Sequence, residues 1–461
     1  MITAKCPALF IAAPASGQGK TTVTAALARM LKRQGKNVFV FKTGPDYLDP
    51  QILKQASGQD VEQLDLWMAG DKYCQQMLFD AAQQADLILI EGVMGMFDGE
   101  PSSADLAARF NIPMAIVMDV KGMAQTAAAI ATGLANFRDD VKVAGLIANN
   151  CSTERHAQLI RDALPESLPL LATLAKSELV ALPERHLGLV QADEIRDELE
   201  TRFNAGADWL ESAGLNQFIE QVPIVEFQST EAAVVNEKND VENITSLKGK
   251  IIAIAKDKAF SFIYDANLRL LDKLGASYLF FSPLEDKEIP QADALWLPGG
   301  YPELHVQQLA NNQNMQQSIR DFHASGKAVL AECGGFLYCL ETLTDLDENE
   351  YPMLNLMKGH GAMRGKRGCQ GMQTAPLPEG EVRGHAHHRS RSHDTPEPIA
   401  FGQRQRSPAP GEAIYRQGNL TATYLHLFFP SNPTAISALF SVSVSEAQTN
   451  ISAEAERVIS C

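Results

Sequence analysis

The sequence predicts an α/β protein made of two doubly wound domains. Two long stretches of the chain alternate short apolar runs with amphipathic segments, and a polar, acidic stretch at 223–249 separates them. Strands that alternate with helices form right-handed crossover units, which build a mostly parallel sheet covered on both faces. A length of 461 residues also fits two domains better than one. We therefore expect domains at 1–222 and 250–446, a linker at 223–249 and a C-terminal tail at 447–461.

Six apolar runs of the first half have the length of buried strands, and helical patterns lie between them. In the first of these patterns Val23, Leu27 and Leu31 recur at helical spacing. The expected strands are Ala8–Ala13, Asn37–Phe41, Asp86–Glu91, Met114–Asp119, Val143–Ala148 and Leu168–Leu174. Those of the second half are Ile251–Ala255, Tyr278–Phe281, Ala294–Leu297 and Ala328–Glu332. The stretch 345–410 is rich in Gly, Arg, His and Pro, so hairpins and loops are expected there.

The composition excludes some classes of function. The chain has 40 Lys and Arg against 56 Asp and Glu, a formal net charge of −16, whereas a nucleic-acid partner requires an excess of basic residues. The 7 cysteines form no CxxC pair, which is typical of reduced thiols in a cytoplasmic protein. No uninterrupted apolar run of about 18 residues occurs, so no membrane span is predicted.

A glycine-rich segment at 16–22, SGQGKTT, follows the first predicted strand and opens the first predicted helix. Glycines there let backbone N–H groups turn toward phosphate oxygens, and the helix N-terminus adds a positive dipole. Lys20 is expected to neutralise the phosphates of ATP, and the Thr21 hydroxyl to bind Mg²⁺. Pro14 replaces the first glycine of the usual pattern, so a plain strand-to-helix turn is the alternative. The residues expected to bind ATP here are Ser16, Gly17, Gly19, Lys20, Thr21 and Thr22.

Two carboxylates stand where predicted strands end: Asp46 follows the second strand, and Glu91 is the last residue of the third. Ligands of open α/β sheets bind beyond the carboxyl ends of the strands, where carboxylates reach the metal under a triphosphate. We therefore expect Thr21, Asp46 and Glu91 to hold Mg²⁺. The alternative is that Asp46 and Asp49 are turn or helix-cap residues beside prolines. For Asp49 and Asp98 the two interpretations are balanced.

Cys333 follows an apolar strand and precedes two glycines in AECGG. A sharp strand-to-helix turn of this kind exposes a nucleophile, and the helix N-terminus is expected to lower the pKa of its thiol. His426, about 90 residues further on, is the expected base. Phe428 occupies the position two residues after His426 where an acid would orient the imidazole. A Cys–His dyad, or an orienting group from elsewhere, is therefore predicted, and a buried structural cysteine is the alternative.

Taken together, the two halves resemble the cobyrinate (or hydrogenobyrinate) a,c-diamide synthases of corrinoid biosynthesis. The resemblance implies a P-loop-type, dethiobiotin-synthetase-like ATPase domain fused to a class I glutamine amidotransferase domain of flavodoxin-like fold. The combination and order of the motifs are specific, whereas any one of them alone is weaker. The motifs are ASGQGKTT at 15–22, KTGPDYLDP at 42–50, IEGVMGMFDG at 90–99, LPGGYPELH at 297–305, AECGGFLY at 331–338 and YLHLFFPSNP at 424–433.

The resemblance implies ATP-dependent, glutamine-hydrolysing amidation of the a and c acetate carboxylates of cobyrinate or hydrogenobyrinate. The Cys333 thiolate attacks glutamine, His426 handles the protons, and Gly300 and Gly334 fit the oxyanion hole. Ammonia then attacks an acyl phosphate that ATP has formed on the substrate carboxylate. The implied partners are a corrinoid, ATP, L-glutamine and Mg²⁺, and a homodimer is left open.

Further residues are matched to the family by motif. Asn149 matches an adenine-contacting position, although capping of a strand end is nearly as good an explanation. Lys42, Tyr47 and Arg383 are matched to the substrate. The basic segment 383–393 either steers a polycarboxylate substrate or forms an exposed hairpin, and both interpretations stay open.

The chain also departs from the family pattern, and the departures bear on the substrate. Gln51, Ile52 and Leu53 replace histidines, Ala386 replaces an acid, and Phe428 replaces a second histidine. One alternative is a diamide synthase for another tetrapyrrole, such as nickel-sirohydrochlorin, or a cobyric acid synthase. Another is a ParA-like regulatory ATPase, which leaves AECGG unexplained, and a third is a plain glutaminase, against which KTGPDYLDP and IEGVMG argue.

Overall fold

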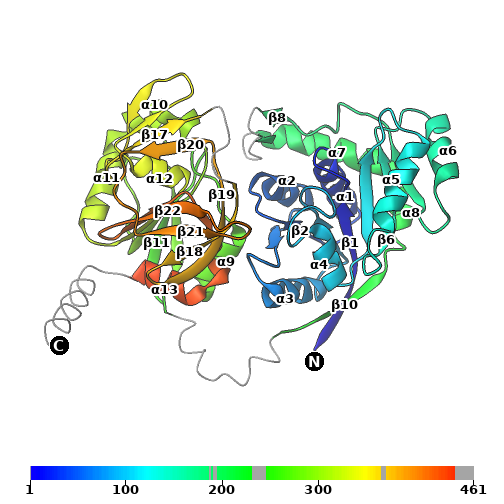
Figure 1. The fold of residues 1–461 in the computed structure, drawn as a ribbon, viewed down its shortest axis with the longest axis horizontal. Helices are drawn as coiled ribbons and strands as arrows, with labels where there is room; N and C mark the ends of the chain where they lie inside the picture. The colour runs from blue at the N-terminus through cyan, green and yellow to red at the C-terminus, as the bar shows by residue number, and fades with distance from the viewer. Residues whose placement is uncertain (1, 186–187, 190–194, 231–245, 365–369, 442–461) are drawn as a thin grey trace. The chain divides into compact units, whose positions relative to one another are not determined.

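The computed structural model describes residues 2–185, 188–189, 195–230, 246–364 and 370–441. The chain divides into two compact units, Met1–Asn236 and Glu237–Cys461, and each combines helices with a large sheet (Figure 1). The predicted α/β fold class is thereby confirmed. The predicted tail at 447–461 and the linker residues 231–245 lie outside the described residues. In the described part, no helix is both long and apolar enough to cross a membrane.

The N-terminal unit is built on a sheet with the strand order β3-β2-β4-β1-β5-β6-β7, and all of these neighbours are parallel. The strands are β1 (Thr3–Ala12), β2 (Val38–Thr43), β3 (Glu62–Leu64), β4 (Leu87–Glu91), β5 (Met114–Asp119), β6 (Val143–Asn149) and β7 (Leu170–Leu174). The six strands expected from apolar runs are all present. A two-stranded sheet of β8 (Glu184–Arg185) and β9 (Gly188–Leu189) lies outside the large one.

Helices cover both faces of this sheet because successive side chains of a strand point to opposite faces. Leu9 and Ile11 pack with Leu27 on one face, whereas Phe10 packs with Leu78 on the other. The first face carries α1 (Lys20–Arg33), α2 (Leu48–Ser57), α7 (Arg196–Ser212) and α8 (Leu215–Ile219). The second carries α3 (Asp71–Ala82), α4 (Ser103–Arg109), α5 (Gln125–Ala135) and α6 (Glu154–Ala163).

An additional strand corrects the predicted linker. Residues 223–249 were expected to form the linker, but β10 (Ile224–Gln228) pairs antiparallel with the start of β1. The reason is the alternation of its side chains, because Val225 and Phe227 are buried while their neighbours are exposed. These residues therefore belong to the N-terminal unit.

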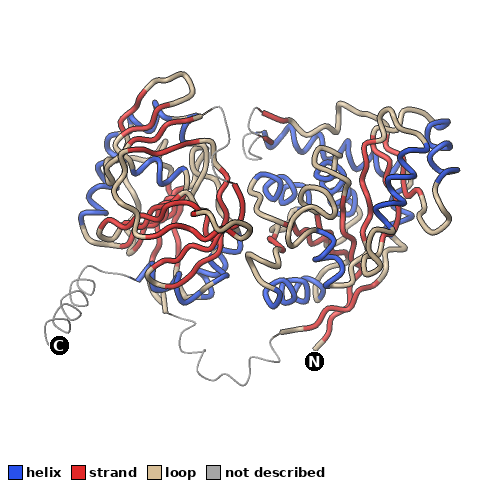
Figure 2. Tube along the Cα trace, viewed as in Figure 1, coloured by secondary structure: helices blue, strands red, loops and turns tan. Residues whose placement is uncertain are grey.

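The C-terminal unit contains a ten-stranded mixed sheet with the order β12-β11-β13-β14-β23-β22-β21-β18-β19-β24. The first five strands are parallel, and the pairs after them are antiparallel. Figure 2 shows these strands in red, with helices in blue around them. The strands are β11 (Ile251–Ala255), β12 (Ser277–Phe281), β13 (Ala294–Leu297), β14 (Ala328–Glu332), β18 (Gln370–Leu377), β19 (Gly380–His387), β21 (Ala400–Arg404), β22 (Pro410–Gln417), β23 (Leu420–Thr423) and β24 (His426–Leu427).

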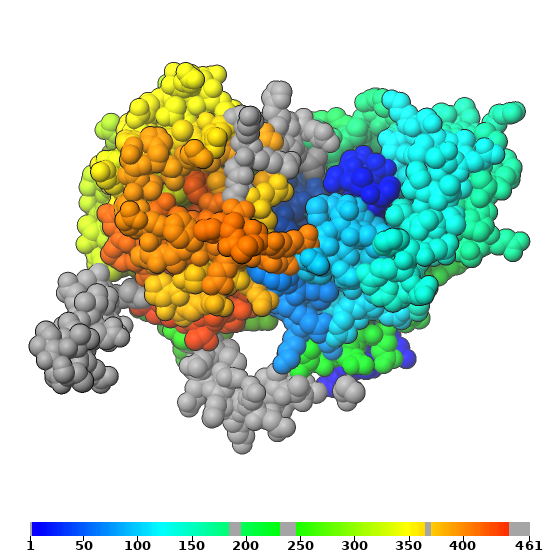
Figure 3. Space-filling view, in the orientation of Figure 1, coloured from blue at the N-terminus to red at the C-terminus, as the bar shows by residue number. Residues whose placement is uncertain are grey.

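Helices again pack on both faces of the sheet, and a smaller sheet lies beside it. One face carries α10 (Val306–Asn311), α11 (Gln313–Ala324) and α12 (Gly334–Cys339), and the other carries α9 (Asp265–Lys273) and α13 (Pro433–Ser441). The smaller sheet contains β15 (Thr342–Thr344), β16 (Glu350–Pro352), β17 (His360–Met363) and β20 (Ser390–His393). Much of this unit's surface on the face drawn in Figure 3 is formed by its yellow and orange segments, the region predicted to form hairpins.

Candidate active site

The loop between β1 and α1 forms a cradle for an anion. Gly17 and Gly19 have φ values of +77° and +96°, which glycine adopts without strain. Lys20 begins α1, and its Nζ donates hydrogen bonds to the carbonyls of Ala15 (3.2 Å) and Met94 (2.7 Å). Burial, together with nearby Lys42, lowers the pKa of Lys20 to about 8. The ammonium group of Lys20 therefore lies beside the loop, bonded to neutral carbonyls. A phosphate bound in the loop would neutralise its positive charge.

The rim of the loop contains the other predicted ATP-binding residues. Ser16 is exposed at the tip, and Thr22 is half-buried in the first turn of α1. Asn149, at the end of β6, donates from Nδ2 to the carbonyl of Gln18 at 3.0 Å. A Cβ atom at Gly19 would collide with this amide, so the close approach requires glycine. The structure therefore brings Asn149 against the loop.

A cluster of carboxylates surrounds Lys42 at the carboxyl ends of β2 and β4. Lys42 Nζ lies 3.1 Å from Glu91 Oε1, 3.1 Å from Asp49 Oδ2 and 4.0 Å from Asp46 Oδ2. The Thr21 hydroxyl donates to the same Glu91 oxygen at 2.8 Å. The structure thus brings the predicted residues of this site together. It also makes Asp49, which the sequence left undecided, as close to Lys42 as Glu91 is.

The charges of this cluster fit a divalent cation. Three carboxylates share one ammonium group, burial raises the pKa of Glu91, and burial together with neighbouring Asp49 raises that of Asp46 to about 8. Glu91 Oε2 is buried without a hydrogen-bond partner among the described residues. Asp46 Oδ1 accepts the backbone N–H groups of Leu48 and Asp49 at the start of α2, so Asp46 also serves as the turn residue that was the alternative.

No three His, Cys, Asp or Glu side chains of the described residues form a ready-made metal cage. Mg²⁺ commonly takes one or two carboxylates and completes its shell with water and phosphate oxygens. Thr21 and Glu91 suit such a partial set of ligands, because the hydroxyl lies against the carboxylate. The donor set therefore fits Mg²⁺ bound together with a nucleotide.

The second centre is a sharp turn between β14 and α12. Cys333 occupies this turn with φ 45° and ψ −100°, an unusual conformation for a residue with a side chain. A Cβ atom at Gly334 would lie 3.0 Å from the N of Gly300 and 2.9 Å from Pro302 Cδ. The main chains of the two predicted oxyanion-hole glycines are therefore adjacent, and a side chain at Gly334 would fill the space between them.

His426 and Cys333 lie against the same glycine. A Cβ atom at Gly299 would be 2.8 Å from Nδ1 of His426 and 3.4 Å from Cβ of Cys333. The His426 ring stacks on that of His385, with 5.0 Å between centroids and 20° between planes. The predicted Cys–His pair is thus brought together, with Cys333 directly after β14 and His426 at the start of β24.

The prediction of a lowered thiol pKa is wrong. Burial raises the pKa of Cys333, and the nearby carboxylates of Glu303 and Glu412 act in the same direction. The N–H of Gly334 at the start of α12 opposes this shift, but it does not outweigh burial. Burial also lowers the pKa of His426 to about 3. The resting pair is therefore a neutral thiol beside a neutral imidazole.

The residues predicted to contact the substrate belong to different units. Tyr47 is half-buried at the start of α2, next to the cluster around Lys42 in the N-terminal unit. Arg383 is exposed on β19 of the C-terminal unit, where its carbonyl accepts the N–H of Phe428 at 2.8 Å. Sequence reasoning missed Glu332, whose buried carboxylate reaches the segment after His426. The feature of the sequence that could have indicated Glu332 is its position directly before the predicted nucleophile, Cys333.

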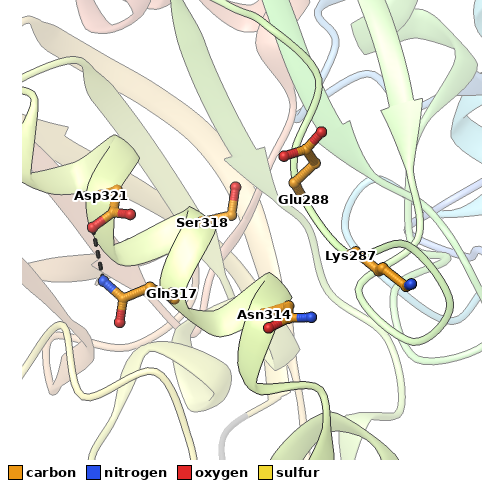
Figure 4. Close-up of a pocket in the computed structure, with 6 residues that line it drawn as sticks. All are labelled: Lys287, Glu288, Asn314, Gln317, Ser318 and Asp321. Atoms are coloured by element: carbon orange, nitrogen blue, oxygen red, sulfur yellow. Dashed lines mark hydrogen bonds between the residues drawn. The ribbon is translucent and has the colours of Figure 1, made fainter.

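A shallow cavity of about 380 Å³ lies elsewhere in the C-terminal unit (Figure 4). It is lined by Lys287, Glu288, Asn314, Gln317, Ser318 and Asp321. Gln317 Nε2 donates to Asp321 Oδ1 at 2.7 Å along α11. None of the predicted site residues lines this cavity, so it is a surface hollow distinct from both centres.

Each unit matches a known family of domains. Residues 9–190 match the CobQ/CobB/MinD/ParA nucleotide binding domain, and 251–434 match the CobB/CobQ-like glutamine amidotransferase domain. The chain is 49% identical over 439 residues to a hydrogenobyrinate a,c-diamide synthase of Stutzerimonas stutzeri, covering 95% of this chain and 99% of the relative. This chain belongs to the cobyrinate and hydrogenobyrinate a,c-diamide synthases. A cobyrinate a,c-diamide synthase of Herminiimonas arsenicoxydans is 47% identical over 434 residues, covering 94% of this chain and 96% of the relative.

Membership of the a,c-diamide synthase family confirms the predicted enzyme class, a glutamine-dependent ligase that forms amides. The nucleotide-binding domain supports the predicted use of ATP. The regulatory ATPase and the plain glutaminase are wrong as accounts of the whole chain, because each leaves one matched domain without a role.

Proposed function

We propose that this chain converts the a and c acetate carboxylates of cobyrinate or hydrogenobyrinate into carboxamides in the cytoplasm, as a step of cobalamin biosynthesis. The observation that carries the proposal is that one chain holds both a phosphate cradle with an acidic cluster and a Cys–His pair. The two close relatives support the substrate class, since one is named for each corrinoid. The similarity to these two relatives argues against nickel-sirohydrochlorin as the substrate and against the reaction of a cobyric acid synthase.

In the glutaminase half, the sulfur of Cys333 attacks the side-chain carbonyl carbon of glutamine. His426 takes the thiol proton as this bond forms and gives it to the departing nitrogen, so that ammonia leaves and a thioester remains. The adjacent N–H groups of Gly300 and Gly334 stabilise the negative oxygen of the tetrahedral intermediate. Water activated by the imidazole then releases glutamate and restores the thiol.

In the synthetase half, a substrate carboxylate attacks the γ-phosphorus of ATP, giving an acyl phosphate and ADP. Lys20 balances the negative charge of the phosphates. Thr21, Asp46 and Glu91 would hold Mg²⁺, which would supply further positive charge there. Lys42 and Tyr47 orient the carboxylate. Ammonia attacks the acyl carbon and phosphate departs, leaving the amide.

Two residues complete the proposal at the edges of the two centres. Asn149 contacts adenine, as its match to the family by motif implies, and its place at the end of β6 puts it beside the phosphate loop. Arg383 contacts the negatively charged substrate, as its exposed side chain carries the opposite charge. A homodimer stays a prediction, to be measured by sedimentation of the purified chain.

The test is an amidation assay followed by mass spectrometry. With ATP, Mg²⁺ and glutamine, the chain is expected to convert two carboxyl groups of cobyrinate or hydrogenobyrinate into carboxamides. Nickel-sirohydrochlorin and the a,c-diamide product serve as control substrates. Amidation of either control, or of neither diacid, contradicts the proposal.

A further inference from the structure

The strand that carries His426 is short and lies at the end of its sheet. β24 contains His426 and Leu427 only, and it pairs with β19, where Gly384 lies opposite Leu427. Phe428 extends this pairing by donating its N–H to the carbonyl of Arg383 at 2.8 Å. Successive N–H groups of a strand point to opposite edges, so the N–H of Leu427 points away from β19. A buried N–H group needs another acceptor.

That acceptor is the side chain of Glu332, the last residue of β14 and the residue before Cys333. Its Oε1 accepts the N–H of Leu427 at 2.8 Å, and its Oε2 accepts the indole N–H of Trp296 at 2.9 Å. Glu332 is 1% exposed and Trp296 is 0% exposed. A single carboxylate therefore joins β13, the strand that ends at the nucleophile and the strand that carries the base.

We propose that Glu332 is a positioning residue of glutamine hydrolysis, which holds the main chain after His426 so that the imidazole faces Cys333. The inference rests on the proposed roles of Cys333 and His426. It supplies the orienting group that the sequence lacks two residues after His426, where Phe428 stands. The carboxylate acts through the backbone N–H of Leu427, the residue after His426.

The cost of burying this carboxylate supports a specific role. A buried acid that is not paired with a cation is unfavourable, and the two donors to Glu332 are the neutral N–H groups of Leu427 and Trp296. Burial raises the pKa of Glu332 to about 8, although its two hydrogen bonds lower it. A glutamine amide would fill the same volume at lower cost. It would not offer an acceptor to both donors at once, because its NH₂ group is itself a donor.

A second buried side chain keeps this segment folded independently of Glu332. Asn267 on α9 donates from Nδ2 to the carbonyl of Leu427 at 2.9 Å and accepts the N–H of Phe429 at 2.8 Å. These bonds hold the residues after His426 to α9. Loss of the carboxylate is therefore expected to shift the imidazole without unfolding the segment.

Glu332→Gln tests the inference in the full-length protein. The amide has the size of the acid but turns an NH₂ group toward one of the two donors, so one hydrogen bond is lost. The kcat of glutamine hydrolysis is expected to fall about tenfold to a hundredfold, because a small misplacement of reacting groups slows the chemical step. The KM for glutamine is expected to change less than about twofold. The substitution leaves in place the contacts that bind glutamine equally in the ground state and the transition state.

Two further variants separate positioning from general stability. Trp296→Phe removes the donor to Oε2 together with part of a ring packed against Phe429, and a smaller fall in kcat with unchanged KM is expected. Gln316→Leu is the matched control, since Gln316 is also buried in this unit and donates to a main-chain carbonyl, that of Leu309 at 3.0 Å. It is expected to lower Tm and to leave kcat unchanged.

The outcomes are distinct. Normal kcat in a folded Glu332→Gln protein overturns the inference, as does an equal fall of kcat in Gln316→Leu. If Glu332→Gln does not fold, Trp296→Phe decides: unchanged kcat there, or a fall no larger than that of Gln316→Leu, overturns the inference, and a larger fall supports it. Glutamine hydrolysis that survives Cys333→Ser overturns the proposed function, whereas its loss there together with normal Glu332→Gln kinetics overturns only the positioning role.

Discussion

The two centres of this chain both lie beyond the carboxyl ends of parallel strands, but they differ in charge. The centre around Lys42 gathers three carboxylates, and an ammonium group of Lys20 lies in the adjoining loop. At the other centre, burial raises the pKa of the Cys333 thiol and lowers that of the His426 imidazole, so both groups are neutral. The first centre is therefore held by ion pairs and the second by backbone contacts and packing.

This difference matches what each centre must stabilise. A triphosphate brings several negative charges, so the first site needs cations in place before the ligand arrives. Amide hydrolysis starts from neutral groups and develops charge only in the transition state, which backbone N–H groups then stabilise. The comparison predicts that the two half-reactions can be abolished one at a time.

The largest effect is expected from Cys333→Ser. Glutamine hydrolysis and glutamine-dependent amidation should fall about 10⁴-fold or more, because the nucleophile of a catalytic set is lost. Amidation with added ammonia should remain within about twofold of the wild-type rate, because the synthetase centre is untouched. Measuring amide formation with each nitrogen source checks both expectations. Parallel loss with both sources would show that the two centres are not separable.

Lys20→Ala is expected to give the converse result. Amidation with ammonia should fall about 10²- to 10³-fold, because one positive group that stabilises the transferring phosphate is removed. Glutamine hydrolysis measured without ATP should be unchanged. Lys36→Ala, which removes an exposed lysine beyond the end of α1, is the matched control and should leave both activities intact. A large loss of amidation activity in Lys36→Ala would mean that the total positive charge in and around α1, and not Lys20 itself, accounts for the effect.

Gly299→Ala is expected to act on the second centre by steric displacement. The added methyl group would overlap the ring of His426, and movement of a base by about 1 Å costs on the order of a hundredfold in rate. Glutaminase kcat is the measurement. Gly133→Ala on α5, where an added Cβ meets nothing within 4 Å, is the control and should be silent. Unchanged kcat in Gly299→Ala would mean that the imidazole of His426 can move away from residue 299 without loss of glutaminase activity.

The same contrast explains what the sequence could predict. The bounds of β5, β11, β13 and β14 were predicted residue for residue, because buried parallel strands are continuous apolar runs. The phosphate loop and the Cys turn were predictable because their chemistry depends on neighbouring residues. The pKa of Cys333 was not, since burial depends on packing by distant segments. Nor was Glu332, whose partner Leu427 lies 95 positions away along the chain.

The smallest effect concerns pH and follows from the neutral state of the second centre. His426 acts as a base only when it is neutral, and its pKa is lowered from 6.5 to about 3 by burial. It therefore stays neutral, and competent, as the pH falls through the range in which an exposed histidine gains a proton. The kcat/KM of glutamine hydrolysis at pH 5 is expected to stay within about twofold of its value at pH 7. A decline centred near 6.5 would show that the imidazole is exposed to water in the free enzyme and that the contrast between the two centres is smaller than the structure indicates.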